Sequence, residues 1–325
     1  GGSVEDELLA TAYFYRAAAL GTLAMFYESF PVDIDGQGGQ SEFVPRAQGL
    51  QRALDLLDQA RQARGGAEPS ADFKTRVYGT TQFFLGNTID AYAARFALML
   101  GQNEQAAQFA SAALSGGEPV SFFPYDAIAP NDNPLWGQTN APDPTLRAVA
   151  NFGLDPNTFT VNTADGRAAF YLGGDAPEGP GIVSGLPTRV VLGFYDAQGE
   201  AIPAYIPDEM RLIRAEAFAR QGQASQAVTE INAVRTDTDD PLGINAGLPA
   251  YSGPTDQQAL LNEIFRQRRI ELFATGLSLE DSRRLGQAAP PASPSFSSFA
   301  RVRNFLPYPE NERTVNRNTP ADPSS

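Results

Sequence analysis

Two short stretches, 122–125 and 131–136, combine aromatic rings with amide and carboxylate groups, and the second contains the only tryptophan. Flat rings stack on the apolar C–H faces of sugars, while amides and carboxylates hydrogen-bond to sugar hydroxyls. We therefore expect a sugar-binding surface here. Its candidate ligand-binding residues are Phe122, Phe123, Tyr125, Asn131, Asp132 and Trp136. The alternative is that these rings pack the loops onto the core, as buried rings usually do.

The absence of histidine and cysteine removes most catalytic and metal chemistry. No Ser-His-Asp or Cys-His machinery can form, and no imidazole or thiolate can bind zinc, haem or an iron–sulfur cluster. Acid–base catalysis would need a pair of carboxylates. Glu216 instead lies four residues before Arg220, and Glu271 lies three residues after Arg268, so both are expected in structural ion pairs. We predict no catalytic residue, no metal ligand and no cofactor.

One loop resembles the start of a calcium-binding loop, because 33–38 has Asp, Asp and Gly at its first, third and sixth positions. An EF-hand loop also needs an acidic or amide acceptor at its fifth position and a bidentate Glu at its twelfth. This chain has Gln37 and Val44 there. Since the bidentate Glu is missing, we interpret 33–38 as a solvated turn.

The net charge and the hydropathy of the chain limit the classes of binding partner that we expect. Lys and Arg number 24 against 38 Asp and Glu, for a net charge of −14. Such a field repels phosphate backbones, so nucleic acid is not an expected partner. The basic cluster at 266–269 is interpreted as a surface for acidic side chains. No stretch approaches the ~18 apolar residues of a membrane span, and residues 1–4 do not resemble a signal peptide, so we expect a mature or trimmed chain.

Apolar residues at spacings of three and four predict helices on both sides of a central segment without regular period. The predicted helices are 5–27, 47–64, 75–100, 103–114, 208–220, 224–235, 256–274 and 279–285. The first has two apolar stripes, one through Leu8 and Tyr15 and one through Leu9 and Tyr13, so we expect it to be buried on two sides. Asp208 is the expected N-cap of its helix. A short strand is expected around 189–194.

An internal repeat organises these helices. The pattern G-Q-x-x-Q-A occurs at Gly101 and again at Gly222, each time between two predicted helices. Glycine allows a tight turn between antiparallel helices, as in tetratricopeptide-like hairpins, which must stack to bury their apolar faces. We predict an all-α fold, a tetratricopeptide-like helical hairpin scaffold formed by 1–117 and 208–325. The loop-rich insertion 118–207, with few short strands, is the expected ligand-binding subdomain.

Four segments of the C-terminal half occur in the order found in a known family. Residues 207–217 read P-D-E-M-R-L-I-R-A-E-A, 222–235 end in I-N-A-V-R, 268–272 read R-R-I-E-L, and 306–312 read L-P-Y-P-E-N-E. They resemble the A-E-A helix, the I-N-x-V-R motif, the R-x-x-E-L motif and the P-I-P-x-x-E ending of the SusD/RagB family of outer-membrane nutrient-binding lipoproteins. Gln267, Thr275 and Ser278 depart from the Glu, Glu and Arg usual in that family. The segment 118–207 is not covered by the resemblance.

The resemblance implies a cell-surface protein of the outer membrane, held by a lipid-anchored cysteine that this sequence does not contain. It also implies a SusC-like TonB-dependent outer-membrane transporter as partner and an oligosaccharide as the usual ligand, with peptides as the ligand of some members. We accordingly expect a nutrient-binding protein that delivers its ligand to the transporter and is not an enzyme. Two alternatives stay open: a tetratricopeptide-like scaffold that binds peptides or proteins but not glycans, and a glycosidase with Asp/Glu chemistry.

Overall fold

The computed structural model describes residues 3–33, 40–128, 130–141, 144–154, 160–175, 188–286 and 303–323. Most of these residues are helical, and the few strands are short, so the predicted all-α class is confirmed. The calcium-like stretch 33–38 lies, apart from Asp33, outside the described residues.

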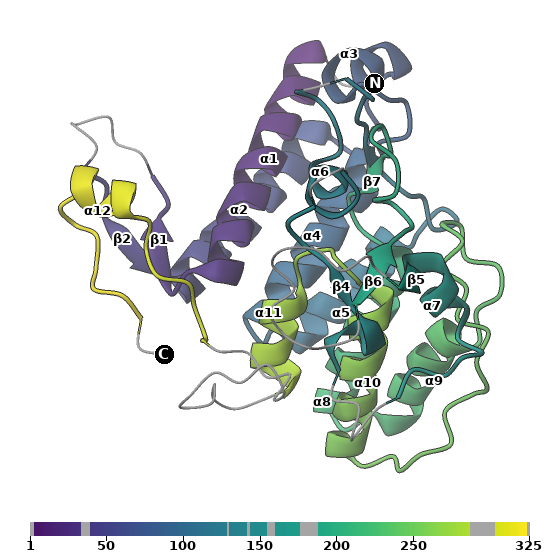
Figure 1. The fold of residues 1–325 in the computed structure, drawn as a ribbon. Coiled ribbons are helices and arrows are strands. Elements are labelled where there is room, and N and C mark those ends of the chain that lie inside the picture. Colours follow the sequence, from purple (N-terminus) through teal and green to yellow (C-terminus); the bar gives the residue numbers. More distant parts are fainter. Residues whose placement is uncertain are drawn as a thin grey trace.

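Seven long helices form the scaffold, in which neighbours in sequence pair and the pairs stack side by side (Figure 1). They are α1 (Val4–Phe26), α2 (Arg46–Arg64), α4 (Leu85–Met99), α5 (Asn103–Ala113), α8 (Pro207–Arg220), α9 (Ala224–Arg235) and α10 (Gln257–Glu271). Helix α1 packs on α2, α4 on α5 and α8 on α9, while α2 contacts α4, α5 contacts α8, and α10 covers α8 and α9. The predicted stacked hairpins are therefore present.

Gly101 and Gly222 make the two turns that the repeat predicts. Their φ angles are +75° and +73°, in the left-handed region that only glycine enters at little cost. Each lies directly between the two helices of its hairpin, α4–α5 and α8–α9. The shared sequence pattern thus reflects a shared backbone requirement.

Three predicted helix boundaries are wrong for local reasons. The expected helix 75–100 is two helices, α3 (Ala71–Tyr78) and α4, because Gly79 ends the first in a left-handed conformation. Asp208 is not an N-cap, since α8 begins one residue earlier at Pro207, whose fixed φ and missing N–H suit a first helical position. The expected helix 279–285 is α11 (Ser278–Asp281) followed by a π-helical turn, Ser282–Gly286. A short helix, α12 (Glu310–Val315), follows near the C-terminus.

The central segment contributes short antiparallel strands and small helices. Strand β3 (Phe122–Phe123) pairs with β7 (Ile202–Pro203), and β6 (Thr188–Val191) lies between β4 (Ala148–Val149) and β5 (Leu172–Asp175). The helices are α6 (Pro134–Thr139), a 3₁₀ turn (Ala150–Gly153) and α7 (Gly166–Tyr171). A further pair, β1 (Ser29–Pro31) with β2 (Phe43–Pro45), follows α1. The strand expected around 189–194 corresponds to β6.

One hydrophobic core joins the helices to the central segment. It includes Phe14 and Phe96 of the scaffold together with Tyr171, Tyr195 and Tyr205 of the central segment, all at most 2% exposed. Several rings of 118–207 therefore pack the loops onto the helices, which was the alternative to ligand binding for aromatic residues of this segment.

Helix α1 differs from its prediction in both apolar stripes. Phe14 and Ala17 are fully buried, but Leu8 and Tyr15 of one stripe remain 50% and 41% exposed, and Leu9 of the other remains 43% exposed, so the expected burial on two sides is wrong at these positions. Helix α1 is also long and apolar enough to cross a membrane, with 23 residues and a mean hydropathy of 1.2, contrary to the sequence-based expectation. Of its apolar window, 44% is buried within the protein, on the side that packs against α2.

Candidate ligand-binding site

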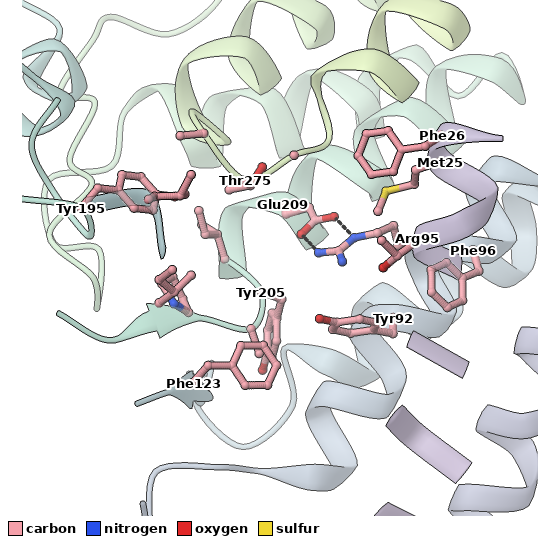
Figure 2. Close-up of a pocket in the computed structure, with 18 residues that line it drawn as sticks. Met25, Phe26, Tyr92, Arg95, Phe96, Phe123, Tyr195, Tyr205, Glu209 and Thr275 are labelled. Carbon is pink, nitrogen blue, oxygen red and sulfur yellow. Dashed lines mark hydrogen bonds and ion pairs between the residues drawn. The ribbon is translucent and has the colours of Figure 1, made fainter. Parts of the chain in front are cut away.

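A pocket of about 280 Å³ lies where α1, α4 and the start of α8 meet the β3–β7 pair and the turn 274–276 (Figure 2). Six of its 18 lining residues are aromatic. The rings that line it are those of Phe26, Tyr92, Phe96, Phe123, Tyr195 and Tyr205. The volume is near the lower limit of about 300 Å³ for small-molecule sites, so it suits one end of a ligand or a single sugar ring.

Arg95 and Glu209 form the charged centre of this wall. Arg95 Nε donates to Glu209 Oε1 at 2.7 Å, and its Nη2 donates to Oε2 at 2.6 Å, so the guanidinium and the carboxylate meet as two parallel forks. Glu209 is 1% exposed, and the Arg95 side chain is 11% exposed. Figure 2 shows the pair between α4 and the start of α8.

Helix periodicity places Arg95 over Tyr92, three residues earlier on α4, with the guanidinium carbon 4.7 Å from the ring centroid. Burial alone would lower the pKa of Arg95, but the Glu209 carboxylate outweighs it and raises that pKa. Burial also raises the pKa of Tyr92, whose hydroxyl therefore stays protonated. The pocket thus offers a fixed cation, a fixed anion and a neutral ring within one wall.

Tyr195 and Tyr205, which also line the pocket, contribute ring atoms rather than hydroxyls. Tyr205 donates its hydroxyl proton to the carbonyl of Pro119, and Tyr195 donates to the carbonyl of Phe273 at 3.4 Å. Because these hydroxyls are bonded to backbone, the exposed parts of both side chains are apolar. This combination of ring faces with a few fixed polar groups is typical of small-molecule sites.

The mouth of the pocket contains strained backbone. Ala274 has a φ of +59°, and Gly276 in the same turn has +84°. A left-handed conformation costs a residue with a side chain about 1–2 kcal/mol, and such strain concentrates at functional sites. Phe152, at +54°, packs its ring 5.4 Å from that of Phe273, just before this turn.

Of the six ligand-binding candidates from the sequence, Phe123 lines the pocket. It lies in β3, with its ring 5.8 Å from that of Phe83. Phe122 is its half-buried neighbour and pairs with Pro203 of β7. Leu135 also lines the pocket, whereas the adjacent Trp136 does not. The structure therefore separates the candidates into one pocket residue and an outer group.

The outer group extends from Phe122 in β3 through the loop before α6 to Trp136 in the first turn of α6. Asn131 is exposed and donates its amide N–H to Asp126 Oδ2 at 3.0 Å, while the Asp126 N–H donates to the Asn131 carbonyl at 2.8 Å. Tyr125, Asp132 and Trp136 are half-buried. The rings of Tyr125 and Trp136 are thus partly accessible to solvent beside the loop that the Asp126–Asn131 hydrogen bonds hold. A ligand role for this outer group stays a prediction.

Asn133 holds that loop in place. Its amide donates to the carbonyls of Phe194 at 2.8 Å and Glu200 at 2.9 Å, and its Oδ1 accepts from the N–H groups of Leu135 and Trp136. A fully buried asparagine with all these bonds fixes the start of α6. The sequence signal was an Asn directly before a proline, the pattern of an N-cap followed by a first helical residue.

Sequence reasoning missed Tyr92, Arg95 and Glu209. A signal was present, because Arg95 stands in the apolar, alanine-rich stretch 91–99. An arginine inside a buried helix needs an acidic partner. Periodicity does not identify that partner, which lies 114 residues away.

The two expected ion pairs have different outcomes. Glu216 pairs with Arg220 at 2.9 Å, as predicted, and also with Arg284 at 2.8 Å. Burial would raise the pKa of Glu216, but Arg284 and Arg220 outweigh it and lower that pKa. Glu271 accepts instead from Arg167 at 3.2 Å, while Arg268 pairs with Asp281, so the predicted Glu271 pairing is wrong.

Comparison with known proteins identifies the fold. No family model matches the sequence, and no curated protein matches it. Among solved structures, a SusD superfamily protein from Bacteroides fragilis superposes with a TM-score of 0.73 at 14% identity, covering 99% of this chain and 81% of that one. A SusD homolog from Bacteroides thetaiotaomicron gives 0.69 at 12% identity, over 97% and 78%. A SusD-like carbohydrate binding protein from B. fragilis gives 0.64 at 14%, over 96% and 79%. The chain therefore has the SusD-like fold, which confirms the sequence resemblance at the level of fold.

Proposed function

We propose that this SusD-like chain is a carbohydrate-binding protein that holds an oligosaccharide without transforming it. The observation that carries the proposal is the ring-lined pocket around Arg95 and Glu209, in a fold shared with a protein described as SusD-like and carbohydrate-binding. Rings stack on the apolar faces of a sugar, and the accessible part of the Arg95 guanidinium, 11% of its side chain, can donate hydrogen bonds to its hydroxyls. The pocket would take one terminal sugar, because its volume is about 280 Å³.

The outer loop would extend this site along the oligosaccharide. Tyr125 and Trp136 are half-buried and keep open ring surface, and Leu135 connects Trp136 to the pocket wall. In this arrangement 118–207 acts as the ligand-binding subdomain on the helical scaffold. Binding at this loop would change the environment of the single tryptophan and hence its fluorescence.

We further propose that the protein works at the cell surface, lipid-anchored in the outer membrane through a residue outside this sequence. It would deliver its ligand to a SusC-like TonB-dependent transporter. The support is the SusD-like fold. Co-expression with a SusC-like TonB-dependent transporter from the same organism, followed by size-exclusion chromatography in detergent, should give a single complex. Separate elution would contradict the delivery step while leaving carbohydrate binding intact.

A glycan array followed by isothermal titration calorimetry tests carbohydrate binding. Phe123→Leu removes a ring from the pocket but keeps its bulk, and we expect affinity for the best glycan to fall about 2- to 13-fold, since a ring contact is worth about 0.5–1.5 kcal/mol. Phe109→Leu is the matched control, because Phe109 is also half-buried but lies under Arg61, outside the pocket lining. An equal loss of glycan affinity in both variants would mean that the pocket is not the glycan-binding site.

An assay of glycan hydrolysis distinguishes a carbohydrate-binding protein from a glycosidase. Any glycan that binds is incubated with the protein, and reducing ends are measured over time. We expect no release above the rate without protein. Steady hydrolysis would overturn the binding-only function.

A peptide- or protein-interaction scaffold is the second candidate, favoured by the exposed apolar stripe on α1. Val4, Leu8 and Tyr15 are 65%, 50% and 41% exposed, more than a core helix needs. If this stripe binds a peptide or protein, Leu8→Gln should weaken that binding and Phe123→Leu should leave it unchanged. A Trp136 fluorescence change with glycans but not with peptides favours the first candidate.

A further inference from the structure

Three aspartates meet beside the first turn of α8. Asp208 comes from that turn, and Asp237 and Asp240 come from the loop that follows α9. One carboxylate oxygen from each lies within 4.8 Å of the others. Asp208 is 1% and Asp240 is 7% exposed, so most of this negative charge is removed from water. Like charges at this separation repel strongly in a buried environment.

Two of these carboxylates each have an oxygen that the protein does not use. Asp208 Oδ1 accepts from Arg211 Nε at 3.0 Å, and Asp240 Oδ1 accepts from the N–H groups of Leu242 and Ile244 at 2.7 and 3.1 Å. The Oδ2 atoms of Asp208 and Asp240 are shielded from solvent and have no hydrogen-bond partner within the described ranges. A buried anionic oxygen without a partner is costly, so each is available to a ligand.

The nearby guanidinium groups are already shared. Arg211 pairs with Glu118 as well as with Asp208, so its charge is divided between two carboxylates. It therefore does not balance Asp237 and Asp240.

A fourth acidic side chain lies near this cluster. Glu271, at the end of α10, is fully buried, and its Oε1 also has no partner in the described part of the chain. Its Oε2 accepts from Arg167, which also forms two bonds to Asp165. Burial, together with the charges of Asp208 and Asp240, raises the pKa of Glu271 well above its usual range, which favours its neutral form. The negative charge of the three aspartates is therefore not balanced by a cation from this neighbour.

We propose that Asp208, Asp237 and Asp240 bind a calcium ion. Carboxylates are hard oxygen ligands, which suit calcium, and two oxygens on opposite sides of one calcium ion are about 4.6–5.2 Å apart, given its 2.3–2.6 Å bonds. The three carboxylate oxygens lie within 4.8 Å of one another, so a single calcium ion can reach all of them. Magnesium, with bonds of about 2.0–2.1 Å, keeps several waters and seldom occupies a cage of protein ligands alone.

Calcium at this site ties the 236–256 loop to the start of α8. Asp240 already organises the loop through its bonds to Leu242 and Ile244, and the Asp237 carbonyl accepts from Gly247 at 2.8 Å. The ion adds a contact between this organised loop and Asp208, replacing repulsion with attraction. Its role is structural, and the proposal does not depend on what the pocket binds.

Calorimetric titration of chelator-treated protein with calcium chloride, and thermal unfolding with and without it, test the proposal. We expect one calcium ion per chain, a Tm higher by several degrees in excess calcium, and reversal by EDTA. Asp240→Asn keeps the Oδ1 acceptor that the loop needs but removes the charge, so it should fold and bind calcium at least 10-fold more weakly. Asp239→Asn is the matched control, because Asp239 is exposed and lies outside the cluster. Asp237→Asn, at a half-buried position, replaces Asp240→Asn if the latter does not fold.

Three results would overturn the site. If titration with calcium gives no heat of binding and the Tm is unchanged, protonation of a carboxylate, rather than a metal ion, neutralises the cluster. An equal loss in Asp239→Asn and Asp240→Asn would assign calcium binding to general surface charge. Magnesium chloride binding as tightly as calcium chloride would refute the calcium assignment.

Discussion

The Arg95–Glu209 pair allows a quantitative test of how the pocket wall is held. Glu209→Gln keeps the shape of the side chain but removes its charge, leaving the Arg95 cation largely buried without a counter-ion. Removing one partner of a buried pair costs about 3–5 kcal/mol. With an m-value of about 3 kcal/mol per M, the urea midpoint should fall by about 1–1.7 M.

A double-mutant cycle separates the pair from the cost of each single change. The cycle comprises Arg95→Met, Glu209→Leu and the double variant. The double variant removes both charges and restores apolar volume, so it should be less destabilised than either single variant. The matched control is the pair of Asp72 and Arg76, four residues apart on α3, whose side chains are 74% and 76% exposed. Its coupling should not exceed about 0.5 kcal/mol.

The cycle is read by urea unfolding followed by far-UV circular dichroism. A coupling free energy for Arg95–Glu209 as small as that of Asp72–Arg76 would refute the reasoning that this pair is desolvated and structurally important. The folded double variant also reports on function. It should lose glycan affinity while retaining the scaffold, because the wall then has no fixed cation or anion.

Three further outcomes follow from single positions. Gly21→Ala would place a Cβ 1.9 Å from the Phe96 ring and should lower thermal stability by about 1–3 kcal/mol or more, whereas Gly137→Ala, which meets nothing within 4 Å, should be neutral or slightly stabilising. Burial raises the pKa of the Tyr78 hydroxyl to about 12, so its contribution to the free energy of unfolding, at most about 2–3 kcal/mol, is complete below pH 10 and is lost as the pH rises towards 12. Tyr78→Phe should therefore reduce the loss of stability at alkaline pH. A smooth tyrosinate absorbance titration at pH 10 in the folded protein would contradict this. Gly222→Ala, at a φ of +73°, should lower the free energy of unfolding by about 1 kcal/mol, measured as a lower urea midpoint. An unchanged midpoint would mean that the hairpin turn tolerates a side chain.

The helical scaffold was predictable because its determinants are local. Apolar periodicity and glycine turns are set by residues within a few positions of one another, which is why both repeat hairpins were found around Gly101 and Gly222. The boundaries at Gly79 and Asp208 failed where one residue's backbone preference shifted the helix end. Leu8 and Tyr15 were assigned to the interior because periodicity defines a face but not what covers it.

The candidate site was less predictable because its parts are distant in sequence. Composition marked a segment that contributes Phe123 to the pocket, but it could not separate rings that line a pocket from rings that pack a loop. Arg95 and Glu209 come from different hairpins, and their partnership exists only once α4 and α8 are stacked. The absence of predicted metal ligands had the same cause, since Asp208 and Asp240 become neighbours only through the return of the loop after α9.

The first turn of α8 connects the two proposed sites. Asp208 and Glu209 are consecutive, and neighbouring side chains on a helix project about 100° apart, so one turn supplies the acidic cluster with one residue and the pocket wall with the next. An ion that fixes Asp208 also restricts the backbone that orients Glu209 against Arg95. If calcium raises the affinity of the pocket by some factor, a bound glycan must raise calcium affinity by the same factor, because the coupling free energy is shared. Calorimetric titration of glycan with and without calcium, and of calcium with and without glycan, therefore tests the connection itself. Equal affinity increases above one-fold would mean that the two sites are coupled through the first turn of α8. No change in either affinity would mean that this turn is already rigid without the ion.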